Sequence, residues 1–206
     1  LFADSALPVR LFHLDKFNSL PVRINLIKDG VATRLPYSAQ DFDYGDAGLA
    51  AKMPADLGFS GFRVMNGPHI ETDWLAFQGA SYFRALGRGN NYGLSARGLA
   101  LNTGVAVPEE FPRFSDFYLE QPPPGAQSVV VNAALDSQSC TGAYRMEITP
   151  GQPTTMNITA RLFFRKDVAE LGIGPLTSMF LHSTYDGQPF DDYRPEVHDS
   201  DGLYMK

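Results

Sequence analysis

The chain has 206 residues, of which 44% are hydrophobic and 19% are charged, as is typical of a globular domain. Its formal net charge of −6 argues against nucleic acid as a partner, because the phosphate backbone would be repelled. Cys140 is the single cysteine, which excludes an internal disulfide and a thiolate zinc cluster. The sequence contains no run of 18 apolar residues, so no membrane span is predicted.

Most of the chain has the pattern of β-strands. In residues 20–37, apolar residues alternate with other residues at Val22, Ile24 and Leu26, and Asp29-Gly30 then marks a turn. This pair favours a hairpin because both turn positions need positive φ. Further strands are expected, in chain order, at 80–86, 93–102, 116–121, 127–135, 142–149 and 154–166. Helical pattern is scarce, with one or two turns expected at 38–42 and at 167–171. Many strands separated by turn signals predict an all-β antiparallel sandwich or barrel.

The segment 80–101 gathers aromatic, arginine and hydroxyl side chains on two predicted strands. Period-two alternation places Tyr82 and Arg84 on one face of the first strand, and Ser95 and Arg97 on one face of the second, with Tyr92 near the turn. Flat aromatic faces and fixed forks of N–H donors suit a neutral polyhydroxylated ligand such as a sugar. An outer sheet face decorated with arginines would give the same pattern, so the residues alone leave both interpretations open.

The densest group of ionisable residues lies near the end of the chain. It contains Asp191, Asp192, Arg194, Glu196, His198, Asp199 and Asp201. Carboxylates beside an arginine and a histidine could form an acid/base centre. The Asp-Ser-Asp-Gly run also favours turns, so a solvated loop fits the same residues.

Six long blocks resemble one protein family. They are 56–64, 79–101, 109–122, 135–148, 171–180 and 191–203, and they resemble the periplasmic glucan biosynthesis proteins, the OpgG/OpgD (MdoG/MdoD) family. The resemblance implies a large antiparallel β-sandwich of the galactose-mutarotase type with a few short helices. It also implies that residues 1–206 are the central portion of one glucan-binding or catalytic domain, without the family's C-terminal immunoglobulin-like domain.

The resemblance also implies a function in making osmoregulated periplasmic glucans, which are β-1,2-linked glucose chains. Family members look like inverting endo-β-1,2-glucanases, in which one carboxylic acid protonates the leaving oxygen and a second carboxylate activates water. The first aspartate of the family's "HDSD" stretch matches Asp199 and takes the role of general base; the general acid is expected in a later segment that the chain does not contain. A non-catalytic glucan-binding scaffold remains the alternative.

The remaining site residues follow from the same resemblance. Besides Asp199, a glucan cleft is expected to use Tyr82, Arg84, Tyr92, Ser95, Arg97, Arg194, His198, Ser200 and Asp201. The mechanism needs no metal or cofactor, and the four histidines lack the spacing of metal ligands. The first ten residues do not read as a signal peptide, so a periplasmic location implies one upstream of this chain. Homodimers are expected for the family.

Overall fold

The structure is a computed structural model that describes all residues except 4, 6, 68–70, 178–179, 186–190 and 200–206. Strands dominate the described residues, and the helical elements are short 3-10 turns. The strands are β1 Val9–His13, β2 Arg23–Lys28, β3 Val31–Arg34, β4 Phe59–Met65, β5 Asp73–Gln78, β6 Tyr82–Ala85, β7 Ser95–Arg97, β8 Leu99–Leu101, β9 Arg113–Glu120, β10 Val129–Asp136, β11 Cys140–Thr149, β12 Thr155–Phe164, β13 Leu171–Ile173, β14 Leu176–Thr177, β15 Phe180–His182 and β16 Val197–His198. The 3-10 turns are η1 Ala39–Asp41, η2 Gly45–Ala47 and η3 Ala50–Lys52.

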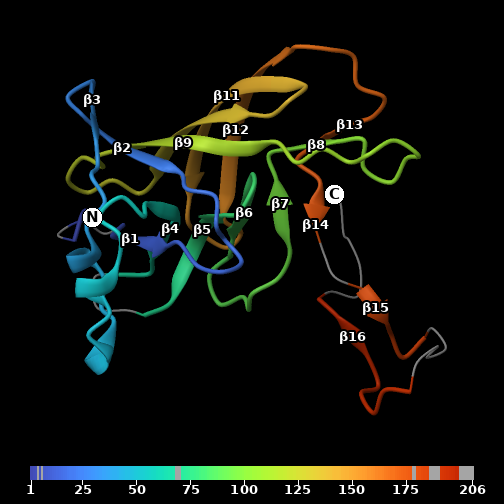
Figure 1. The fold of residues 1–206 in the computed structure, drawn as a ribbon, viewed down its shortest axis with the longest axis horizontal. Helices are drawn as coiled ribbons and strands as arrows, with labels where there is room; N and C mark the ends of the chain where they lie inside the picture. The colour runs from blue at the N-terminus through green and yellow to red at the C-terminus, as the bar shows by residue number, and fades with distance from the viewer. Residues whose placement is uncertain (4, 6, 68–70, 178–179, 186–190, 200–206) are drawn as a thin grey trace.

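Two six-stranded sheets form the layers of a β-sandwich (Figure 1). The first sheet, called here the site sheet, has the order β1-β4-β5-β6-β7-β14. The second, called the framework sheet, has the order β12-β11-β10-β9-β2-β3. Neighbouring strands pair antiparallel except β2 and β9, which run parallel. The predicted all-β sandwich is therefore confirmed.

Aromatic side chains fill the space between the two sheets. The Phe62 ring from β4 stacks on Phe77 from β5 at a centroid distance of 5.0 Å, and Phe117 from the framework sheet meets Phe62 edge-on at 5.1 Å. Phe114 continues the cluster at 5.5 Å from Phe117. Edge-to-face and offset-stacked rings at these distances add attraction beyond the burial of apolar area, so this cluster fixes how the sheets face one another.

The strand predictions hold for β2, β3, β6 and β9–β12, but β1, β4 and β5 and the short strands β13–β16 fall outside the predicted ranges. The hairpin of β2 and β3 turns at Asp29 and Gly30, whose φ angles of 52° and 76° are both positive as predicted. The predicted strand at 93–102 is divided into β7 and β8, while β1, β4 and β5 were not predicted at all. In β4 a glycine hides the strand pattern: a Cβ at Gly61 would lie 2.0 Å from the Phe77 carbonyl oxygen. Glycine normally weakens a strand, yet this close approach requires it.

The predicted helical turn at 167–171 is wrong. The backbone N–H groups of Ala169 and Glu170 donate to the side-chain oxygen of Asn102, at 3.1 and 3.2 Å, so they do not start a helix. Leu171 then begins β13, which pairs with β8. The other predicted turn, at 38–42, forms as η1, with the Ser38 hydroxyl accepting from the backbone N–H of Gln40.

The last described strands form a small hairpin beyond the site sheet. β15 pairs with β16, and Figure 1 shows this hairpin past β14, apart from the two large sheets. Among the described residues, no helix is both long and apolar enough to cross a membrane. The hairpin matters because its end carries Asp199.

Candidate functional site

Alternation along β6 separates core from surface on the site sheet. Phe83 points inward and is 7% exposed, whereas Tyr82 and Arg84 point to the outer face. The next strand, β7, presents Ser95 on the same outer face, and β14 adds Thr177. A cavity of about 500 Å³ opens there, referred to below as the Asp199 cavity; it is lined by Tyr82, Arg84, Tyr92, Gly93, Ser95, Thr177 and Asp199.

A buried carboxylate organises one wall of this cavity. Asp73 is 7% exposed, and its Oδ1 accepts a hydrogen bond from the Tyr92 hydroxyl at 3.1 Å. Its Oδ2 lies 3.8 Å from the guanidinium of Arg84, and its Oδ1 lies 3.6 Å from that of Arg63. The Arg84 guanidinium in turn stands 4.3 Å from the centre of the Tyr92 ring. Asp73 therefore holds Arg84 and Tyr92 together, and a cation over an aromatic face adds to this arrangement.

Asp199 enters the cavity from a distant part of the chain. It follows β16 directly and is exposed, while the opposite wall comes from β6 and β7. Thr177 closes the near side, since its hydroxyl donates to the backbone oxygen of Ser95 at 2.9 Å. Of the described C-terminal candidates, Asp199 thus lies in one cavity with the candidates of β6 and β7. An exposed carboxylate beside aromatic faces, hydroxyls and a guanidinium can accept a proton from water while a polar ligand is held.

Four of the predicted binding residues lie in the Asp199 cavity, and Arg97 does not. Arg97 is 6% exposed, and its guanidinium donates to Glu109 at 2.8 Å and lies 5.1 Å from the ring of Phe111. It is also the cross-strand partner of Tyr82, and its guanidinium stands 5.8 Å from the Tyr82 ring, so it flanks the wall on the same face of the sheet. Its place in the structure is that of a buried ion-pair partner.

The C-terminal candidates are more scattered. Arg194 forms a two-pronged ion pair with Asp192, at 2.9 and 2.5 Å, which holds the pKa of that carboxyl well below its usual range. His198 lies 3.6 Å from Glu196, on the hairpin. Neither Arg194 nor His198 lines the Asp199 cavity. Ser200 and Asp201 lie outside the described residues.

Sequence reasoning missed three residues of this site. Thr177 lies on a two-residue strand that no periodicity reveals, and Gly93 belongs to the β6–β7 turn. Asp73 follows a segment without a strand pattern, and only pairing with β4 places it beneath Tyr92. The signal that could have found Asp73 is its position just before the apolar run Trp74–Leu75.

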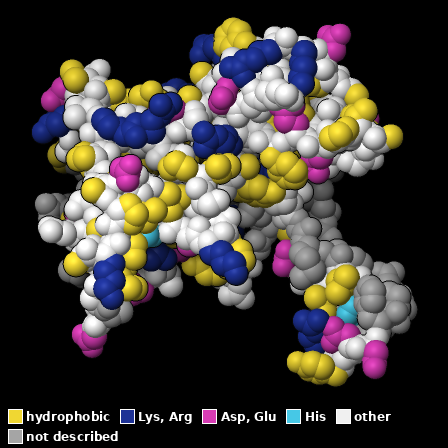
Figure 2. Space-filling model, in the orientation of Figure 1, with side chains coloured by type: hydrophobic (Ala, Val, Ile, Leu, Met, Phe, Trp, Pro, Cys, Tyr) yellow, Lys and Arg dark blue, Asp and Glu magenta, His cyan; other side chains and the backbone are white. Residues whose placement is uncertain are grey.

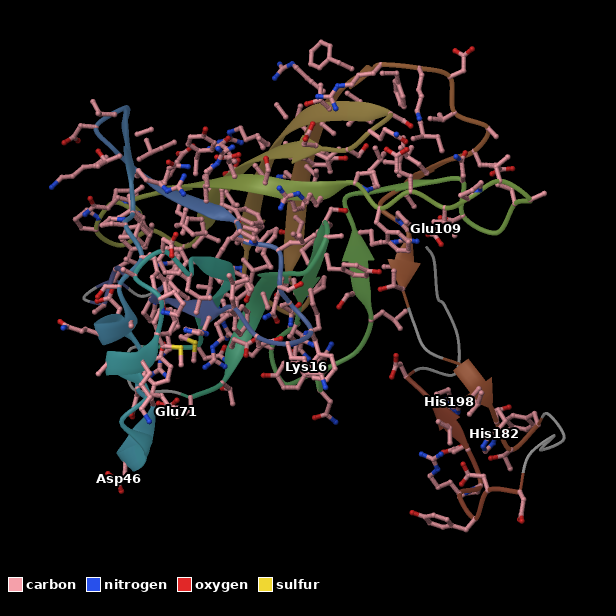
Figure 3. All side chains as sticks on the ribbon, in the orientation of Figure 1. Lys16, Asp46, Glu71, Glu109, His182 and His198 are labelled. Carbon is pink, nitrogen blue, oxygen red and sulfur yellow. The ribbon has the colours of Figure 1, made fainter. Side chains whose placement is uncertain are left out.

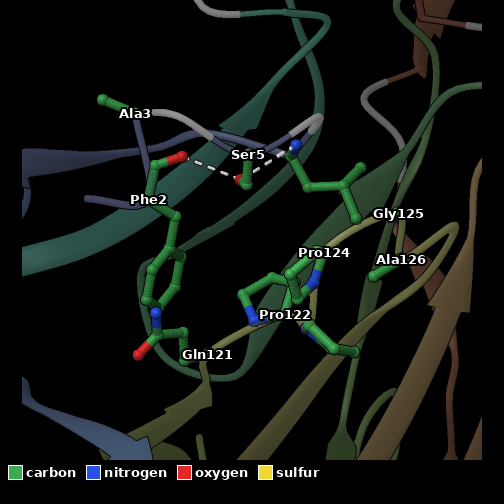
Figure 4. Close-up of a pocket in the computed structure, with 10 residues that line it drawn as sticks. Phe2, Ala3, Ser5, Gln121, Pro122, Pro124, Gly125 and Ala126 are labelled. Carbon is green, nitrogen blue, oxygen red and sulfur yellow. Dashed lines mark hydrogen bonds between the residues drawn. The ribbon is translucent and has the colours of Figure 1, made fainter.

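Other hollows of the structure have different chemistry. A cavity of about 530 Å³ between the N-terminal segment and the 121–126 turn is shown in Figure 4. Its described lining residues carry no charged side chain; they are Phe2, Ala3, Ser5, Leu7, Gln121, Pro122, Pro123, Pro124, Gly125 and Ala126. A cavity of about 610 Å³ lies at the other end of β5 and β6, and it shares only Tyr92 with the Asp199 cavity. The 610 Å³ cavity also combines a carboxylate, Asp73, with hydroxyl and aromatic groups, but that carboxylate is buried, whereas the carboxylate of the Asp199 cavity is exposed.

Among the residues that the structure describes, the histidines and carboxylates do not gather into a metal site. Figure 2 shows basic and acidic side chains interspersed over the visible face. Figure 3 shows His182 and His198 together on the hairpin, away from Glu71 and Glu109. Within the described part of the chain, no group of three or more histidine, cysteine, aspartate or glutamate side chains is placed to hold a metal ion.

The fold and the site define an antiparallel β-sandwich protein with a polar, aromatic-lined cavity on the outer face of one sheet. Residues 2–206 match the family model described as "Periplasmic glucan biosynthesis protein, MdoG", and the chain belongs to this family. It is 50% identical to glucans biosynthesis protein G of Cereibacter sphaeroides over 98% of its length. It is 47% identical to a probable glucans biosynthesis protein D of Shewanella oneidensis and to a glucans biosynthesis protein D of Xylella fastidiosa, over 98% of its length in each case. The chain spans 38% of the length of each of these relatives.

Proposed function

We propose that the chain serves in the biosynthesis of periplasmic glucans as part of an inverting endo-β-1,2-glucanase, with Asp199 as the general base. The observation that carries the proposal is the position of Asp199, which reaches the same cavity as Tyr82, Arg84 and Ser95. Family membership supports glucan as the ligand class. The β-1,2 linkage and the hydrolytic reaction extend beyond the names of the relatives.

The geometry suits the base side of the reaction. In inverting hydrolysis, a carboxylate removes a proton from a water molecule, and that water attacks the sugar carbon from the face opposite the leaving oxygen. Asp199 is exposed at the cavity mouth, so a water can stand between its carboxylate and a sugar held against β6 and β7. Direct attack by Asp199 is a different reaction with retention, and the stereochemistry of the product separates the two.

The reaction also needs a general acid. Inverting enzymes place the two carboxyl groups about 6.5–9.5 Å apart, which leaves room for the water. Among the described lining residues, Asp199 is the sole carboxylate of the cavity, because Asp73 lies behind Tyr92 and Arg84. We place the acid in the part of the longer relatives that this chain does not span. On this proposal the 206-residue chain binds glucan without cleaving it.

The residues around Asp199 suit a neutral sugar. Tyr82 and Tyr92 offer flat rings with hydroxyl groups, and Arg84 offers N–H donors to sugar oxygens. A neutral ligand is not repelled by the chain's net charge of −6. A periplasmic location also agrees with Cys140, which is fully buried; burial raises the pKa of its thiol and keeps it unreactive.

One observation favours a second function. The described lining of the cavity holds a single carboxylate beside several groups that bind without reacting. A glucan-binding scaffold of the synthesis machinery would need only these binding groups. In that case the cavity guides the growing chain, and Asp199 accepts hydrogen bonds from sugar hydroxyls.

An Asp199→Asn variant separates the two functions. The substitution keeps the size of the side chain and removes its ability to act as a base. In a full-length protein carrying this chain, we expect new reducing ends from linear β-1,2-glucan to fall roughly 100- to 10,000-fold. Glucan binding, measured on the same preparation by calorimetry, should stay within about threefold.

Three results would contradict the catalytic proposal. They are unchanged cleavage by Asp199→Asn, a product with retained anomeric configuration, and cleavage by the 206-residue chain alone. No cleavage by the unsubstituted full-length protein, together with glucan binding that Asp199→Asn weakens, would establish the scaffold function.

A further inference from the structure

A small cavity lies away from the Asp199 cavity, beside the connection between β1 and β2. Its volume is about 170 Å³, and it shares no lining residue with the Asp199 cavity. Residues 17–20 of the connection form one side of it. The turn of Gly79 and Ala80 and the start of β9, at Arg113 and Phe114, form the other side. We call this hollow the loop cavity.

The floor of the loop cavity is apolar, and its buried hydroxyl group already has partners. Val22, Ser60 and Phe114 line the floor and are all buried. The Ser60 hydroxyl donates to the His13 carbonyl oxygen at 2.8 Å and accepts from the Gln78 amide at 3.0 Å. A cavity of about 150 Å³ with apolar walls holds a benzene molecule. The loop cavity therefore has room for one apolar side chain of a ligand.

Two large apolar side chains stand at the rim of the loop cavity with most of their surface in water. Phe17 is 87% exposed and Leu20 is 65% exposed, and both line the cavity. The apolar surface therefore continues from the buried floor to the outside of the molecule. Exposed apolar surface around a pocket is typical of a site where a partner protein inserts one anchoring side chain.

The loop that carries this rim is held in one shape by hydrogen bonds. The Asp15 carboxylate accepts from the backbone N–H groups of Phe17 and Asn18, at 2.7 and 2.8 Å. At the far end of the loop, the N–H of Val22 donates to the Phe59 carbonyl oxygen at 2.8 Å. A surface that is fixed before a partner arrives loses little conformational entropy when the partner binds.

Two cationic side chains flank the loop cavity. Arg113 lines it, and its guanidinium donates to the Pro21 carbonyl oxygen at 3.2 Å. The cross-strand neighbour of Arg113 is Asp136, whose carboxylate pairs with Arg165 at 2.8 Å, so the Arg113 charge is left for a ligand. Lys16 is exposed on the loop, and Figure 3 shows it at the lower edge of the two-sheet body.

These charges indicate the chemistry of the partner. Lys16 and Arg113 outnumber Asp15, the carboxylate of the loop, whereas the whole chain has a net charge of −6. Complementary charges across an interface steer the partner and reject wrong ones. An anionic lipid surface would also meet a positive and apolar loop, but it has no side chain to fill a concave cavity. The buried floor therefore favours an acidic peptide with one apolar side chain.

We propose that the loop cavity docks an acidic segment of a partner protein, which inserts one side chain of leucine or phenylalanine size between Leu20 and Arg113. The inserted side chain contacts the buried floor, and carboxylates beside it meet Lys16 and Arg113. The loop cavity is separate from the Asp199 cavity, so this inference goes beyond the proposed function and does not depend on it.

The test measures the binding of short synthetic peptides by NMR. We would titrate the isotope-labelled 206-residue protein with acetyl-Asp-Leu-Asp-amide and follow its backbone amide signals. Two control peptides each lack one feature: Asn-Leu-Asn has no charge, and Asp-Ser-Asp has no apolar side chain. The signals of Ser60, Gly79, Ala80 and Phe114 should shift with Asp-Leu-Asp, with a roughly millimolar Kd. Each control peptide should bind roughly threefold more weakly or worse.

Two variants and one matched control assign the contacts. Arg113→Met keeps the stem and removes the charge, so Asp-Leu-Asp should bind roughly 2- to 5-fold more weakly while Asn-Leu-Asn binds unchanged. Leu20→Ser removes apolar rim surface, so it should weaken both of these peptides. Arg161→Met changes an exposed arginine on β12 that lines none of the cavities described above, and it should change nothing. Circular dichroism checks the fold of each variant before binding is measured.

The outcomes decide between partner classes. The proposal fails if none of the three peptides shifts the cavity signals, or if Asp-Leu-Asp and Asn-Leu-Asn bind equally well. Equal affinities of Arg113→Met and Arg161→Met for Asp-Leu-Asp would also overturn it. Binding to phosphatidylglycerol vesicles that Leu20→Ser abolishes, without peptide binding, would assign the loop to a lipid surface. The proposed function stands under each of these results, because Leu20 and Arg113 lie outside the Asp199 cavity.

Discussion

The two faces of the site sheet differ in chemistry although the same strands form both: one face is apolar and buried, and the other is polar and partly exposed. On the inner face, Phe62, Phe77 and Phe83 are nearly or completely inaccessible to water and pack ring against ring. On the outer face, the residues next to them in sequence, such as Arg63 and Arg84, keep about a third of their side chains exposed. A change of one position along a strand therefore moves a side chain from the buried core to the polar outer face.

The difference lies in what holds each face together. Inner rings need only apolar surface, which is non-directional and roughly proportional to buried area. Outer arginines are held by one buried acid, Asp73, whose carboxylate faces Arg63, Arg84 and the Tyr92 hydroxyl. Burying a carboxylate costs free energy unless charges and hydrogen bonds compensate it. The outer face is thus ordered by a buried charge and its partners, and the proposed binding surface depends on that charge, whereas the inner face depends on apolar packing.

The largest effect is expected on the inner face. Phe62→Ala removes a ring that is 0% exposed and that contacts both Phe77 and Phe117. The free energy of unfolding should fall by about 3–5 kcal/mol, because a cavity remains where the ring packed. Urea denaturation followed by tryptophan fluorescence measures this, with Phe17→Ala as the surface control. A loss below about 1 kcal/mol would show that the aromatic cluster does not organise the sandwich.

The second effect is a loss of stability at high pH. Burial raises the pKa of Tyr144 to about 12, and its hydroxyl donates to the Gly98 carbonyl oxygen at 2.9 Å. Burial, with the hydrogen bond to Tyr44, also raises the pKa of Tyr37 to about 12. An unfolded tyrosine has a pKa of about 10. Above pH 10 the unfolded chain loses these protons before the folded chain does, so stability should fall as pH rises from 10 to 12.

For Tyr144, which is 4% exposed, this loss is about 2–3 kcal/mol, and the half-buried Tyr37 contributes less. Unfolding free energies measured at several pH values between 9 and 12 report it directly. Tyr144→Phe should reduce the slope and leave the part that Tyr37 contributes. An identical slope in Tyr144→Phe would contradict the assignment to this residue.

A third prediction concerns Arg97, which the sequence placed in the binding group and which the structure places beside Tyr82, in an ion pair with Glu109 and outside the lining of the Asp199 cavity. Arg97→Met should lower the free energy of unfolding by about 1–3 kcal/mol, because Glu109 loses its partner in a largely buried contact. Glucan affinity should stay within about twofold of the unsubstituted protein. A large loss of affinity with unchanged stability would return Arg97 to the binding site.

The outer face itself should respond in the opposite way. Arg84→Met keeps the stem of the side chain and removes the guanidinium that faces the Asp199 cavity. Glucan affinity should fall roughly 10-fold, because a charged donor to sugar oxygens is lost. Arg145→Met serves as the matched control, because it changes a half-exposed arginine on β11 that lines none of the cavities described above. Equal affinities of the two variants would remove Arg84 from the site.

The smallest effect is expected at Arg194. Its guanidinium pairs with Asp192 on the exposed hairpin, and it does not line the Asp199 cavity. Arg194→Gln should therefore change neither unfolding nor glucan affinity measurably, since exposed ion pairs contribute little. Loss of glucan binding in this variant would show that other hairpin residues besides Asp199 contact the ligand.

The sequence was informative where local chemistry decides the structure. The Asp29-Gly30 turn and the long alternating strands β10, β11 and β12 were predicted from their own residues. β4 and β5 were not, because Gly61 and the short run at 73–78 look unlike strands until their neighbours are present. At the site, alternation correctly placed Tyr82 and Arg84 on one face, and it could not reveal that Arg97 pairs with Glu109.

By itself, the sequence determined the all-β class and the strands with clear alternation. Through resemblance to one family, it also made Asp199 a candidate for the general base. Period-two patterns and turn residues act over a few positions, so they can be read without the fold. The tertiary structure alone decided that Asp199 meets Ser95 and Tyr82 in one cavity and that Asp73 fixes its wall. These contacts join strands far apart in the chain, and only the packing of the sheets brings them within reach.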